Sequence, residues 1–513
     1  MSIKSVAAKI FAKIIHSKNQ KWIQNPIETQ HKVFLDLIRQ AEKTQFGNDH
    51  NFSKIKSFND FANQVPIRDY EELRPYVDKV VKGEADILWK GKPLYFAKTS
   101  GTTSGAKYIP LTKESMPFHI EAARNAILAY IYETGKADFV DGKMIFLQGS
   151  PILEDKNGIQ LGRLSGIVAH FVPKYLQKNR MPSWETNCIE DWETKVNAIV
   201  EETFNEDMSV ISGIPSWVQM YFEKLQEKAQ SEPKANGAKL KPVGELFKNF
   251  NLFIYGGVNF EPYRAKFENL IGRKVDSIEL FPASEGFFAY QDSQKDKGML
   301  LLLNSGIFYE FVKTDEFFTD PEGSGPKRYT IGEVELNVNY VLIISTNAGL
   351  WAYNIGDTIQ FTSLQPYRVI VSGRIKHYIS AFGEHVIGKE VECALKEAME
   401  NTSIRVNEFT VAPQITPETG LPFHEWFIEF DPEASGEPNN IAEFALRIDA
   451  AMRKQNVYYD DLIVGKVLRT VVITKVAKNG FQEYMKSIGK LGGQNKLPRL
   501  SNDRKIANLL KRA

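Results

Sequence analysis

Cysteine is scarce in this chain of 513 residues, and its scarcity excludes two kinds of site. Cys188 and Cys393 lie far apart, and neither belongs to a C-x-x-C pair. A disulfide framework or a zinc ribbon needs more cysteines at closer spacing. The closest of the eight histidines, His377 and His385, lack the i,i+4 spacing that puts two imidazoles on one helix face. We therefore expect a cytoplasmic protein without a built-in transition-metal site.

Long apolar runs and a surplus of charge are also missing. The longest apolar stretches, residues 299–303 and 340–344, have the length of a strand, whereas a bilayer span needs roughly 18 to 20 residues. The 64 Lys and Arg nearly balance the 63 Asp and Glu, which leaves a net charge of +1. Proteins that bind nucleic acids or membranes through charge need a basic face. We therefore expect no nucleic acid and no membrane among the partners, and a monomer.

The first 20 residues combine lysines with apolar positions at helical spacing. The apolar positions are Ile3, Val6, Ile10, Phe11 and Ile14, and the lysines are Lys4, Lys9, Lys13 and Lys18, with no acidic residue before Glu28. The pattern resembles an organellar presequence or a membrane-surface helix. It has no Arg, no continuous apolar segment and no small-residue cleavage site, so the favoured interpretation is a helix that docks its apolar stripe on the protein itself.

Hydrophobic periodicity predicts a large domain with mixed secondary structure. Helical periodicity dominates to about residue 90, and strand-like and helical segments then alternate, which favours an α/β fold with buried sheets. The expected strands are residues 143–148, 252–255, 277–281, 299–303 and 341–345, and the expected helices include 114–132 and 217–228.

From about residue 376 the pattern restarts as a separate α+β domain. A helix is expected at 388–400 and another at 441–455, with strands at 408–412, 424–430 and 470–475. A segment of this size can enclose its own core. We therefore expect a large N-terminal domain, residues 1–375, and a small C-terminal domain, residues 376–513.

Hydroxyl groups and glycines are concentrated in residues 98–107, KTSGTTSGAK. Such a loop could wrap backbone N–H groups and hydroxyls around phosphate oxygens while Lys107 neutralises charge. The glycine spacing is not that of a Walker loop, and an ordinary Ser/Thr/Gly turn is the alternative. The candidate phosphate-binding residues are Thr99, Ser100, Gly101, Thr102, Thr103, Ser104 and Lys107.

Two carboxylates follow strand-like segments or turns further along the chain. In FPASEG, residues 281–286, Glu285 stands at a strand end, where it could hold Mg²⁺ carried in by a nucleoside triphosphate. A solvated turn with a core Phe281 is the alternative. In WAYNIGD, residues 351–357, Asp357 comes after a glycine turn and could accept hydrogen bonds from both ribose hydroxyls.

Two further segments indicate a function only in combination with these. Residues 373–376, GRIK, lie at the expected domain junction, and residues 492–499, GGQNKLPR, form a basic loop near the end. By itself the second would be interpreted as a solvated tail. In this order, the five segments resemble the acyl-adenylate-forming superfamily, and more specifically the bacterial type of the GH3 family of acyl acid amido synthetases.

The resemblance covers nearly the whole chain and rests on four motifs. TSGTTSGAK resembles that family's phosphate-binding loop, FPASEG its YxxSE motif, YNIGD its YRxGD motif and GQNKLPR its terminal lysine segment. It departs from the family at Phe281, where Tyr is usual, at Asn354, where Arg is usual, and at Lys376, where many superfamily members have a hinge Asp.

The resemblance also implies a role for each matching residue. Lys496 would contact the α-phosphate and the carboxylate, Glu285 would bind Mg²⁺ and Lys107 would neutralise phosphate. The remaining ATP contacts would come from the phosphate loop together with Gly256, Gly257, Phe281, Ser284, Tyr353, Asp357 and Arg374.

These roles imply an adenylate-forming fold, with a large multi-sheet N-terminal domain and a mobile α+β domain that brings Lys496 to ATP. The implied reaction is ATP- and Mg²⁺-dependent adenylation of a carboxylic acid, followed by acyl transfer to an amine, such as an amino acid. Two alternatives remain open, an acyl-CoA synthetase and a nucleotide-binding protein without turnover. Segments 119–130, 164–171 and 213–217 are candidates for the acyl pocket, although the core is the favoured interpretation of each.

Overall fold

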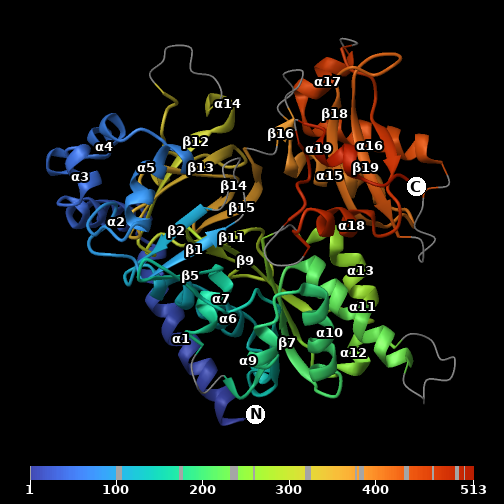
Figure 1. Ribbon diagram of the computed structural model, residues 1–513, viewed down its shortest axis with the longest axis horizontal. Helices are drawn as coiled ribbons and strands as arrows, with labels where there is room; N and C mark the ends of the chain where they lie inside the picture. Colours follow the sequence, from blue (N-terminus) through green and yellow to red (C-terminus); the bar gives the residue numbers. More distant parts are fainter. Residues whose placement is uncertain are drawn as a thin grey trace. The chain divides into compact units, whose positions relative to one another are not determined.

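The computed structural model consists of two compact units, which are described separately (Figure 1). The first contains Met1–Val258 and Glu268–Ile370, and the second contains Asn259–Phe267 and Val371–Ala513. The structure describes residues 2–99, 107–172, 177–231, 241–257, 260–317, 325–375, 378–379, 386–431, 438, 440–464, 467–491, 496–501 and 503–513. That residues 376–513 act as a mobile domain stays a prediction.

The first unit begins with helices, as the periodicity predicts. They are α1 (Ile3–Ile23), α2 (Pro26–Ala41), α3 (Gln45–Asp49), η1 (Phe52–Lys54), α4 (Phe58–Gln64) and α5 (Tyr70–Val81). Capping boxes fix the starts of α4 and α5, at Ser57 and Asp69. The carboxylate of Asp69 accepts hydrogen bonds from the N–H groups of Glu71 and Glu72, so α5 begins directly after the segment that ends at Arg68.

Helix α1 packs on the first unit by a different face from the one expected. Its buried residues are Ser5, Ala12, Ile15 and Trp22, and it meets α6 (Met116–Thr134) and η2 (Asp138–Asp141). The apolar stripe of Ile3, Val6, Ile10 and Ile14 is exposed, so the prediction that it docks on the protein is wrong. Ser5 and Ala12 are small and let the helix approach its neighbours closely. Helices of the described ranges, α1 included, are not long and apolar enough to cross a membrane.

A small sheet carries both ends of the predicted phosphate loop. Its order is β2-β1-β5-β4, with β1 (Tyr95–Thr99), β2 (Lys107–Leu111), β4 (Glu154–Lys156) and β5 (Ile159–Gly162). Strands β1 and β2 are antiparallel, and Thr99 lies opposite Lys107. The two ends of the predicted loop are therefore neighbours.

The main sheet of the first unit has a parallel and an antiparallel half. Its order is β12-β13-β14-β15-β11-β10-β9-β8-β7-β3-β6. The strands are β3 (Lys143–Phe146), β6 (Arg180–Met181), β7 (Met208–Ser212), β8 (Leu252–Gly256), β9 (Asp276–Ala283), β10 (Gly286–Tyr290), β11 (Met299–Leu301), β12 (Ile307–Lys313), β13 (Asn339–Thr346), β14 (Tyr353–Leu364) and β15 (Tyr367–Arg374). Strand β9 is parallel to β8 and antiparallel to β10, so the strand pairing changes from parallel to antiparallel at β9.

Helices alternate with the strands of this sheet along the chain, so the predicted α/β alternation is confirmed. The helices between and after its strands include α7 (Leu164–Ala169), α9 (Trp184–Asn187), α10 (Trp192–Thr203), α11 (Pro215–Ser231), α12 (Val243–Leu246), α14 (Thr314–Phe317) and η3 (Ile331–Glu333), whereas α13 (Glu261–Ile271) is divided between the two units. Helix α6 packs against β9 and β10. Strands β7 and β8 are buried, as apolar strands of a parallel sheet are.

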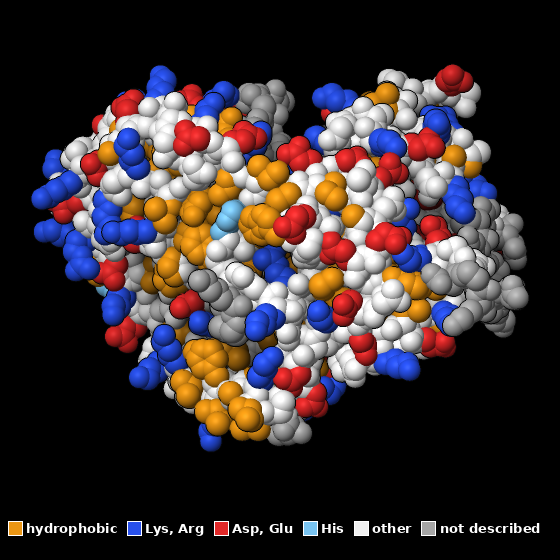
Figure 2. All heavy atoms as spheres, turned by 60° about the horizontal axis from the view of Figure 1, so that its bottom comes forward, with side chains coloured by type: hydrophobic (Ala, Val, Ile, Leu, Met, Phe, Trp, Pro, Cys, Tyr) orange, Lys and Arg blue, Asp and Glu red, His pale blue; other side chains and the backbone are white. Residues whose placement is uncertain are grey.

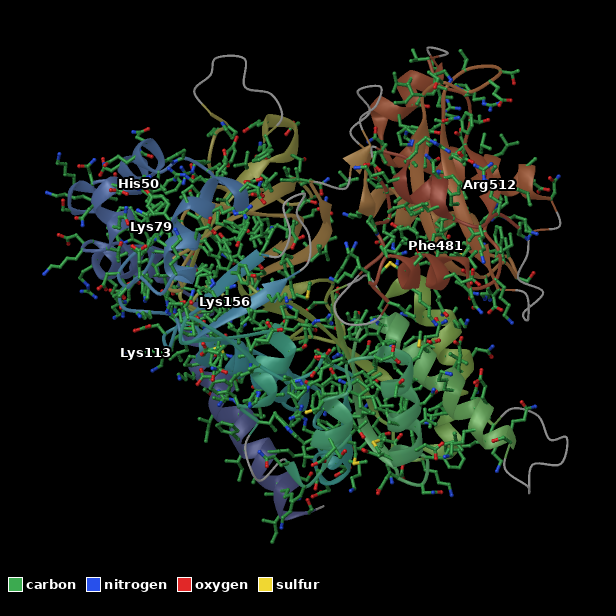
Figure 3. The ribbon with its side chains drawn as sticks, in the orientation of Figure 1. His50, Lys79, Lys113, Lys156, Phe481 and Arg512 are labelled. Carbon is green, nitrogen blue, oxygen red and sulfur yellow. The ribbon has the colours of Figure 1, made fainter. Side chains whose placement is uncertain are left out.

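The second unit is a small α+β structure, as predicted, around the three-stranded sheet β18-β19-β20. Its elements are β16 (Tyr378–Ile379), β17 (Val386–Ile387), α15 (Gly388–Met399), β18 (Val406–Gln414), β19 (Phe423–Phe430), α16 (Ile441–Gln455), α17 (Val457–Val464), β20 (Val472–Lys475), α18 (Gly480–Ser487) and α19 (Lys505–Leu509). Side chains of β19 alternate between two cores. Trp426 packs with residues of α15 and α16, whereas Phe427 packs with Phe481 of α18, which is labelled in Figure 3.

A buried ion pair in the first unit ties β12 to α4. Nε of Arg328 lies 2.7 Å from Oε1 of Glu310, and Glu310 is fully buried. Arg328 Nη1 also donates to the carbonyl oxygens of Ala62 and Val65, at 3.2 and 2.6 Å. Burial raises the pKa of Glu310, although the charge of Arg328 opposes the shift. Removing the guanidinium would leave a buried carboxylate without its cation.

We expect Arg328→Met to lower the free energy of unfolding by about 3–5 kcal/mol, because one charge of a buried pair is removed. The control is Lys313→Met, on the same strand as Glu310, which breaks a more exposed ion pair with Glu335 and should cost about 1 kcal/mol or less. Urea unfolding followed by tryptophan fluorescence measures both. Equal losses in the two variants would contradict the prediction.

Candidate active site

The carboxyl ends of the parallel strands β8 and β9 form one wall of the candidate site. The two strands are in register, with Gly256 opposite Leu280. A Cβ atom on Gly256 would lie 2.7 Å from the carbonyl oxygen of Leu280, so only glycine fits there. Gly257 follows with a φ of +86°, which also favours glycine. Gly256 and Gly257, which the resemblance implies as ATP contacts, therefore offer bare backbone at the carboxyl ends of the strands, where ligands of open α/β sheets bind.

The predicted Mg²⁺ ligand Glu285 lies in the tight turn between β9 and β10. Ala283 pairs with Gly286, so Ser284 and Glu285 alone form the loop. Phe281 precedes this turn in β9, and its ring centroid lies 5.0 Å from that of Phe288. Because the Phe281 side chain is only 7% exposed, a ligand could reach little more than the edge of its ring.

The antiparallel half of the sheet curls so that β12 returns to β10. A Cβ atom on Gly286 would lie 2.5 Å from Cδ1 of Ile307 in β12, although four strands separate β10 from β12 in the sheet order. Ile307 pairs with Thr346 at the end of β13. Two residues earlier in β13, Ile344 pairs with Tyr353, the first residue of β14. The β9–β10 turn and the start of β14 therefore lie at the same end of the curled sheet.

Residues 353–357, YNIGD, form a bulged part of strand β14 rather than the predicted turn. The register between β13 and β14 shifts next to the pair Ile343–Asn354. Gly356 has a φ of +85°, and its N–H donates to Oδ1 of Asn354 at 2.8 Å. The prediction of a turn is wrong because the chain stays in the same sheet, where glycine allows the bulge. Asp357 is half-buried within this bulge.

Lys107 and Tyr353, both predicted to bind the nucleotide, lie together although they belong to different sheets. The Nζ atom of Lys107 is 3.5 Å from the hydroxyl oxygen of Tyr353. The same Nζ is 5.4 Å from the ring centroid of Tyr70, whose hydroxyl accepts a hydrogen bond from the N–H of Tyr108 at 2.8 Å. The fold thus brings a cation at one end of the predicted phosphate loop to the start of the YNIGD strand.

A segment that sequence reasoning missed holds this arrangement in place. Arg68 forms a parallel bridge with Tyr353. Its N–H donates to the carbonyl oxygen of Ala352 at 3.1 Å, and its carbonyl accepts from the N–H of Asn354 at 2.8 Å. Ala352 has a φ of +44°, a conformation that is costly for alanine and that often marks functional sites. The capping box at Asp69 could have indicated that a helix begins there. It could not have shown that the preceding residue, Arg68, lies next to Tyr353.

The side chain of Arg68 extends this cluster into the helical region. Its guanidinium donates to Nε2 of His50 at 2.9 Å and lies 5.5 Å from the ring centroid of Phe46. His50, labelled in Figure 3, also bonds through Nδ1 to the carbonyl oxygen of Phe46 at 2.8 Å. Burial lowers the pKa of His50, so the imidazole accepts from Arg68 in its neutral form.

Several predicted site residues lie outside the described residues. These are Ser100, Gly101, Thr102, Thr103 and Ser104 of the phosphate loop, Lys376 at the expected junction, and residues 492–495 of the terminal loop. Thr99 and Arg374 are described by their backbone only, Thr99 at the end of β1 and Arg374 at the end of β15.

Lys496 opens a described segment of the second unit that is anchored on β18. The N–H of Val411 donates to the carbonyl oxygen of Arg499 at 2.9 Å. The side chain of Arg499 forms ion pairs with Glu392, at 3.2 Å, and with Glu408. The lysine itself is exposed. The end of the terminal loop is thus fixed three residues after Lys496.

Within the described ranges, no group of three or more His, Cys, Asp and Glu side chains could hold a metal ion. The protein groups found there therefore do not form a complete metal cage. A single carboxylate such as Glu285 still suits Mg²⁺, because Mg²⁺ is often held by one or two carboxylates together with substrate phosphates and water.

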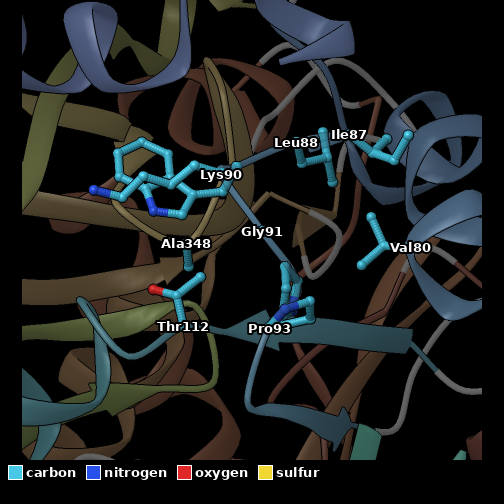
Figure 4. A pocket seen from close by; sticks show the side chains of 10 residues that line it. Val80, Ile87, Leu88, Lys90, Gly91, Pro93, Thr112 and Ala348 are labelled. Carbon is cyan, nitrogen blue, oxygen red and sulfur yellow. The ribbon is translucent and has the colours of Figure 1, made fainter. Parts of the chain in front are cut away.

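The segments proposed for the acyl pocket lie mainly in the core. His119 of α6 is buried, and burial lowers its pKa to about 4. Trp217 is also buried, and its ring centroid lies 4.5 Å from that of Trp192, with the two rings tilted by 45°. A small cavity near Trp89, shown in Figure 4, has a volume of about 10 Å³. It holds no more than one water molecule, so it is not a substrate site.

Models of the GH3 family match most of the chain in the expected order. The N-terminal domain model matches residues 16–187, the central domain model residues 300–374 and the C-terminal domain model residues 389–505. The central match ends at Arg374, and it includes the YNIGD strand. The terminal match includes Lys496.

Plant proteins are similar over much of the chain. A jasmonoyl–L-amino acid synthetase of Nicotiana attenuata, JAR4, is 23% identical over 445 residues, 74% of each chain. A jasmonoyl–L-amino acid synthetase of Oryza sativa subsp. japonica, GH3.5, is 21% identical over 527 residues, 88% of each chain.

Solved structures share the fold. The GH3.15 acyl acid amido synthetase has a TM-score of 0.76 at 15% identity and covers 97% of this chain and 96% of its own. A 2-hydroxyisobutyryl-CoA ligase in the postadenylation state has a TM-score of 0.57 at 12% identity, with 93% and 90% covered. The adenylate-forming fold expected from the sequence is thereby confirmed. With its three domain models in order and this fold, the chain belongs to the GH3 family of acyl acid amido synthetases, which are adenylate-forming ligases.

Proposed function

We propose that this protein activates a carboxylic acid with ATP and joins the acyl group to an amino acid. The contact between Lys107 and Tyr353 carries the proposal, because it joins one end of the predicted phosphate-binding segment to the predicted ribose-binding strand. The family uses ATP, and two similar proteins are named as L-amino acid synthetases. These names support an amino acid as the acceptor.

The reaction has two steps because a carboxylate is a poor electrophile. Its negative charge repels a nucleophile, and its oxygen is a poor leaving group. In the first step a carboxylate oxygen attacks the α-phosphorus of ATP, the bond to the bridging oxygen breaks, and pyrophosphate leaves. In the second the amine nitrogen attacks the acyl carbon, AMP leaves with the bonding pair, and the nitrogen loses a proton. The protein contributes positioning and charge stabilisation, and no side-chain nucleophile is required.

We assign the nucleotide to the end of the curled sheet. Gly256 and Gly257 would face the adenine, with the edge of Phe281 beside it. Asp357 would accept from the ribose hydroxyls, with Arg374 in support. The hydroxyls and N–H groups of residues 99–104 would surround the phosphates, and Lys107 would stabilise their charge.

Glu285 and Ser284 would act at the β9–β10 turn, with Glu285 as the protein ligand of Mg²⁺. When bound, Mg²⁺ neutralises phosphate charge and orients the leaving pyrophosphate. Lys496, from the second unit, would stabilise the charge that builds on the α-phosphate and the attacking carboxylate. The anchoring of Arg499 on β18 supports a defined position for this lysine.

We expect Lys496→Ala to abolish carboxylate-dependent exchange of labelled pyrophosphate into ATP, with ATP binding largely unchanged. The lysine acts on charge that develops only during the transfer, so its loss affects the rate more than nucleotide affinity. Exchange is measured first in the wild type with a panel of carboxylic acids, and then in the variant with the best acid. The matched control is Lys490→Ala, which removes an exposed lysine shortly before the terminal loop. Unchanged exchange in the Lys496 variant would refute the assignment.

We expect Asp357→Ala to weaken ATP binding about tenfold or more, because a carboxylate loses hydrogen bonds that contribute roughly 1.5–3 kcal/mol each. Isothermal titration calorimetry measures the dissociation constant. Asp155→Ala removes an exposed carboxylate from β4 and should leave the affinity unchanged. An unaltered affinity in the Asp357 variant would show that this residue does not bind the ribose.

A further inference from the structure

Helix α1 carries two apolar faces, and one of them is exposed. The exposed fractions of Ile3, Ile10 and Ile14 are 89%, 59% and 57%. At about 100° per residue, these three side chains fall within about 40° of one another and lie roughly opposite the buried Ala12. Val6 extends the stripe and is 43% exposed. The helix is thus fixed on the first unit by one face and presents a bulky aliphatic stripe on the other.

Lysines border this stripe on both sides. By the same helical geometry, Lys9 and Lys13 lie on one flank and Lys4 and Lys18 on the other. The helix contains five lysines and no acidic residue, whereas basic and acidic side chains are interspersed over the face drawn in Figure 2. The net charge of +1 therefore conceals a local positive surplus.

The neighbours of α1 do not cancel this surplus along the stripe. Asp141 and Asp138 accept hydrogen bonds from Ser2 and Ser5, and Ser5 belongs to the buried face. On the other side, the guanidinium of Arg124 lies 5.5 Å from the ring centroid of Phe11, which adds a cation next to the stripe. Arg124 also has Glu121 at 3.7 Å, a distance typical of weak surface pairs.

We propose that α1 docks this protein on an anionic lipid surface. Ile3, Val6, Ile10 and Ile14 enter the boundary between headgroups and acyl chains, and the flanking lysines meet the lipid phosphates. A second copy of the chain fits less well, because it would bring rows of lysine side chains against each other. The stripe offers only aliphatic groups, which suits a fluid apolar layer that makes no demand for matched hydrogen bonds.

This proposal replaces the expectation that no membrane is among the partners. That expectation rested on the net charge of the whole chain and on the lack of a spanning segment, and neither bears on a helix that lies in the membrane surface. Because α1 is already folded and held by Ala12, Ile15 and Trp22, docking does not have to order the helix, which reduces the entropic cost of binding.

The test is co-sedimentation of the full chain with vesicles of phosphatidylcholine alone, or of an equal mixture of phosphatidylcholine and phosphatidylglycerol. We expect binding to the anionic vesicles, with a loss of at least about tenfold in Ile10→Ser/Ile14→Ser, since burying one isoleucine side chain corresponds to roughly a tenfold change in a partition constant. Lys9→Gln/Lys13→Gln should weaken binding and reduce its dependence on salt.

The control is Leu446→Ser, which changes an equally exposed aliphatic residue, 56% exposed, on α16 of the second unit. It should bind as the wild type does. Pyrophosphate exchange without vesicles should be the same in all variants, which shows that each is folded. Absent binding to anionic vesicles, or unchanged binding of Ile10→Ser/Ile14→Ser, would overturn the proposal. So would a dimer, seen by sedimentation velocity, that only these two substitutions abolish, because the stripe would then be a contact between copies.

Discussion

The short parallel bridge between Arg68 and Tyr353 is the constraint on which the candidate active site depends. Two backbone hydrogen bonds, at 3.1 and 2.8 Å, join the helical region at the N-terminus to the start of β14. Two residues on, the hydroxyl of Tyr70 accepts from β2 of the small sheet. The three residues Arg68 to Tyr70 thus connect the helices, the main sheet and the small sheet. It brings Lys107 to Tyr353 and holds Ala352 in a strained conformation.

The sequence predicted elements whose signals are local, and it failed where distant contacts decide. Helix α16 begins at the residue expected because Asn440 caps it, with its side chain accepting from two N–H groups. YNIGD was expected to form a turn, since a Gly-Asp pair does not reveal that both of its flanks pair with β13. The periodicity of α1 identified an apolar stripe but not the face of Ser5, Ala12, Ile15 and Trp22 that packs. The place of Arg68 beside Tyr353 had no sequence signal, because the bridge joins residues far apart in the chain.

Small groups of cationic side chains can bind anions in this molecule, although the protein as a whole is nearly neutral. In the proposed site the nucleotide would meet N–H groups, Lys107, Lys496 and a Mg²⁺ ion held by Glu285. At the other location the lysines of α1 surround an apolar stripe. Neither needs a basic surface over the whole protein. The net charge of +1 therefore limits long-range attraction without limiting either site.

In the proposed reaction, ATP activates a carboxylate for transfer to an amino acid. The most direct measurement incubates the full chain with ATP, Mg²⁺, coenzyme A, a panel of carboxylic acids and each amino acid, and quantifies nucleotide and conjugate by mass spectrometry. We expect one AMP for each amide formed, with both absent when acid or amino acid is omitted. Formation of ADP, or of a thioester with coenzyme A in place of any amide, would contradict it.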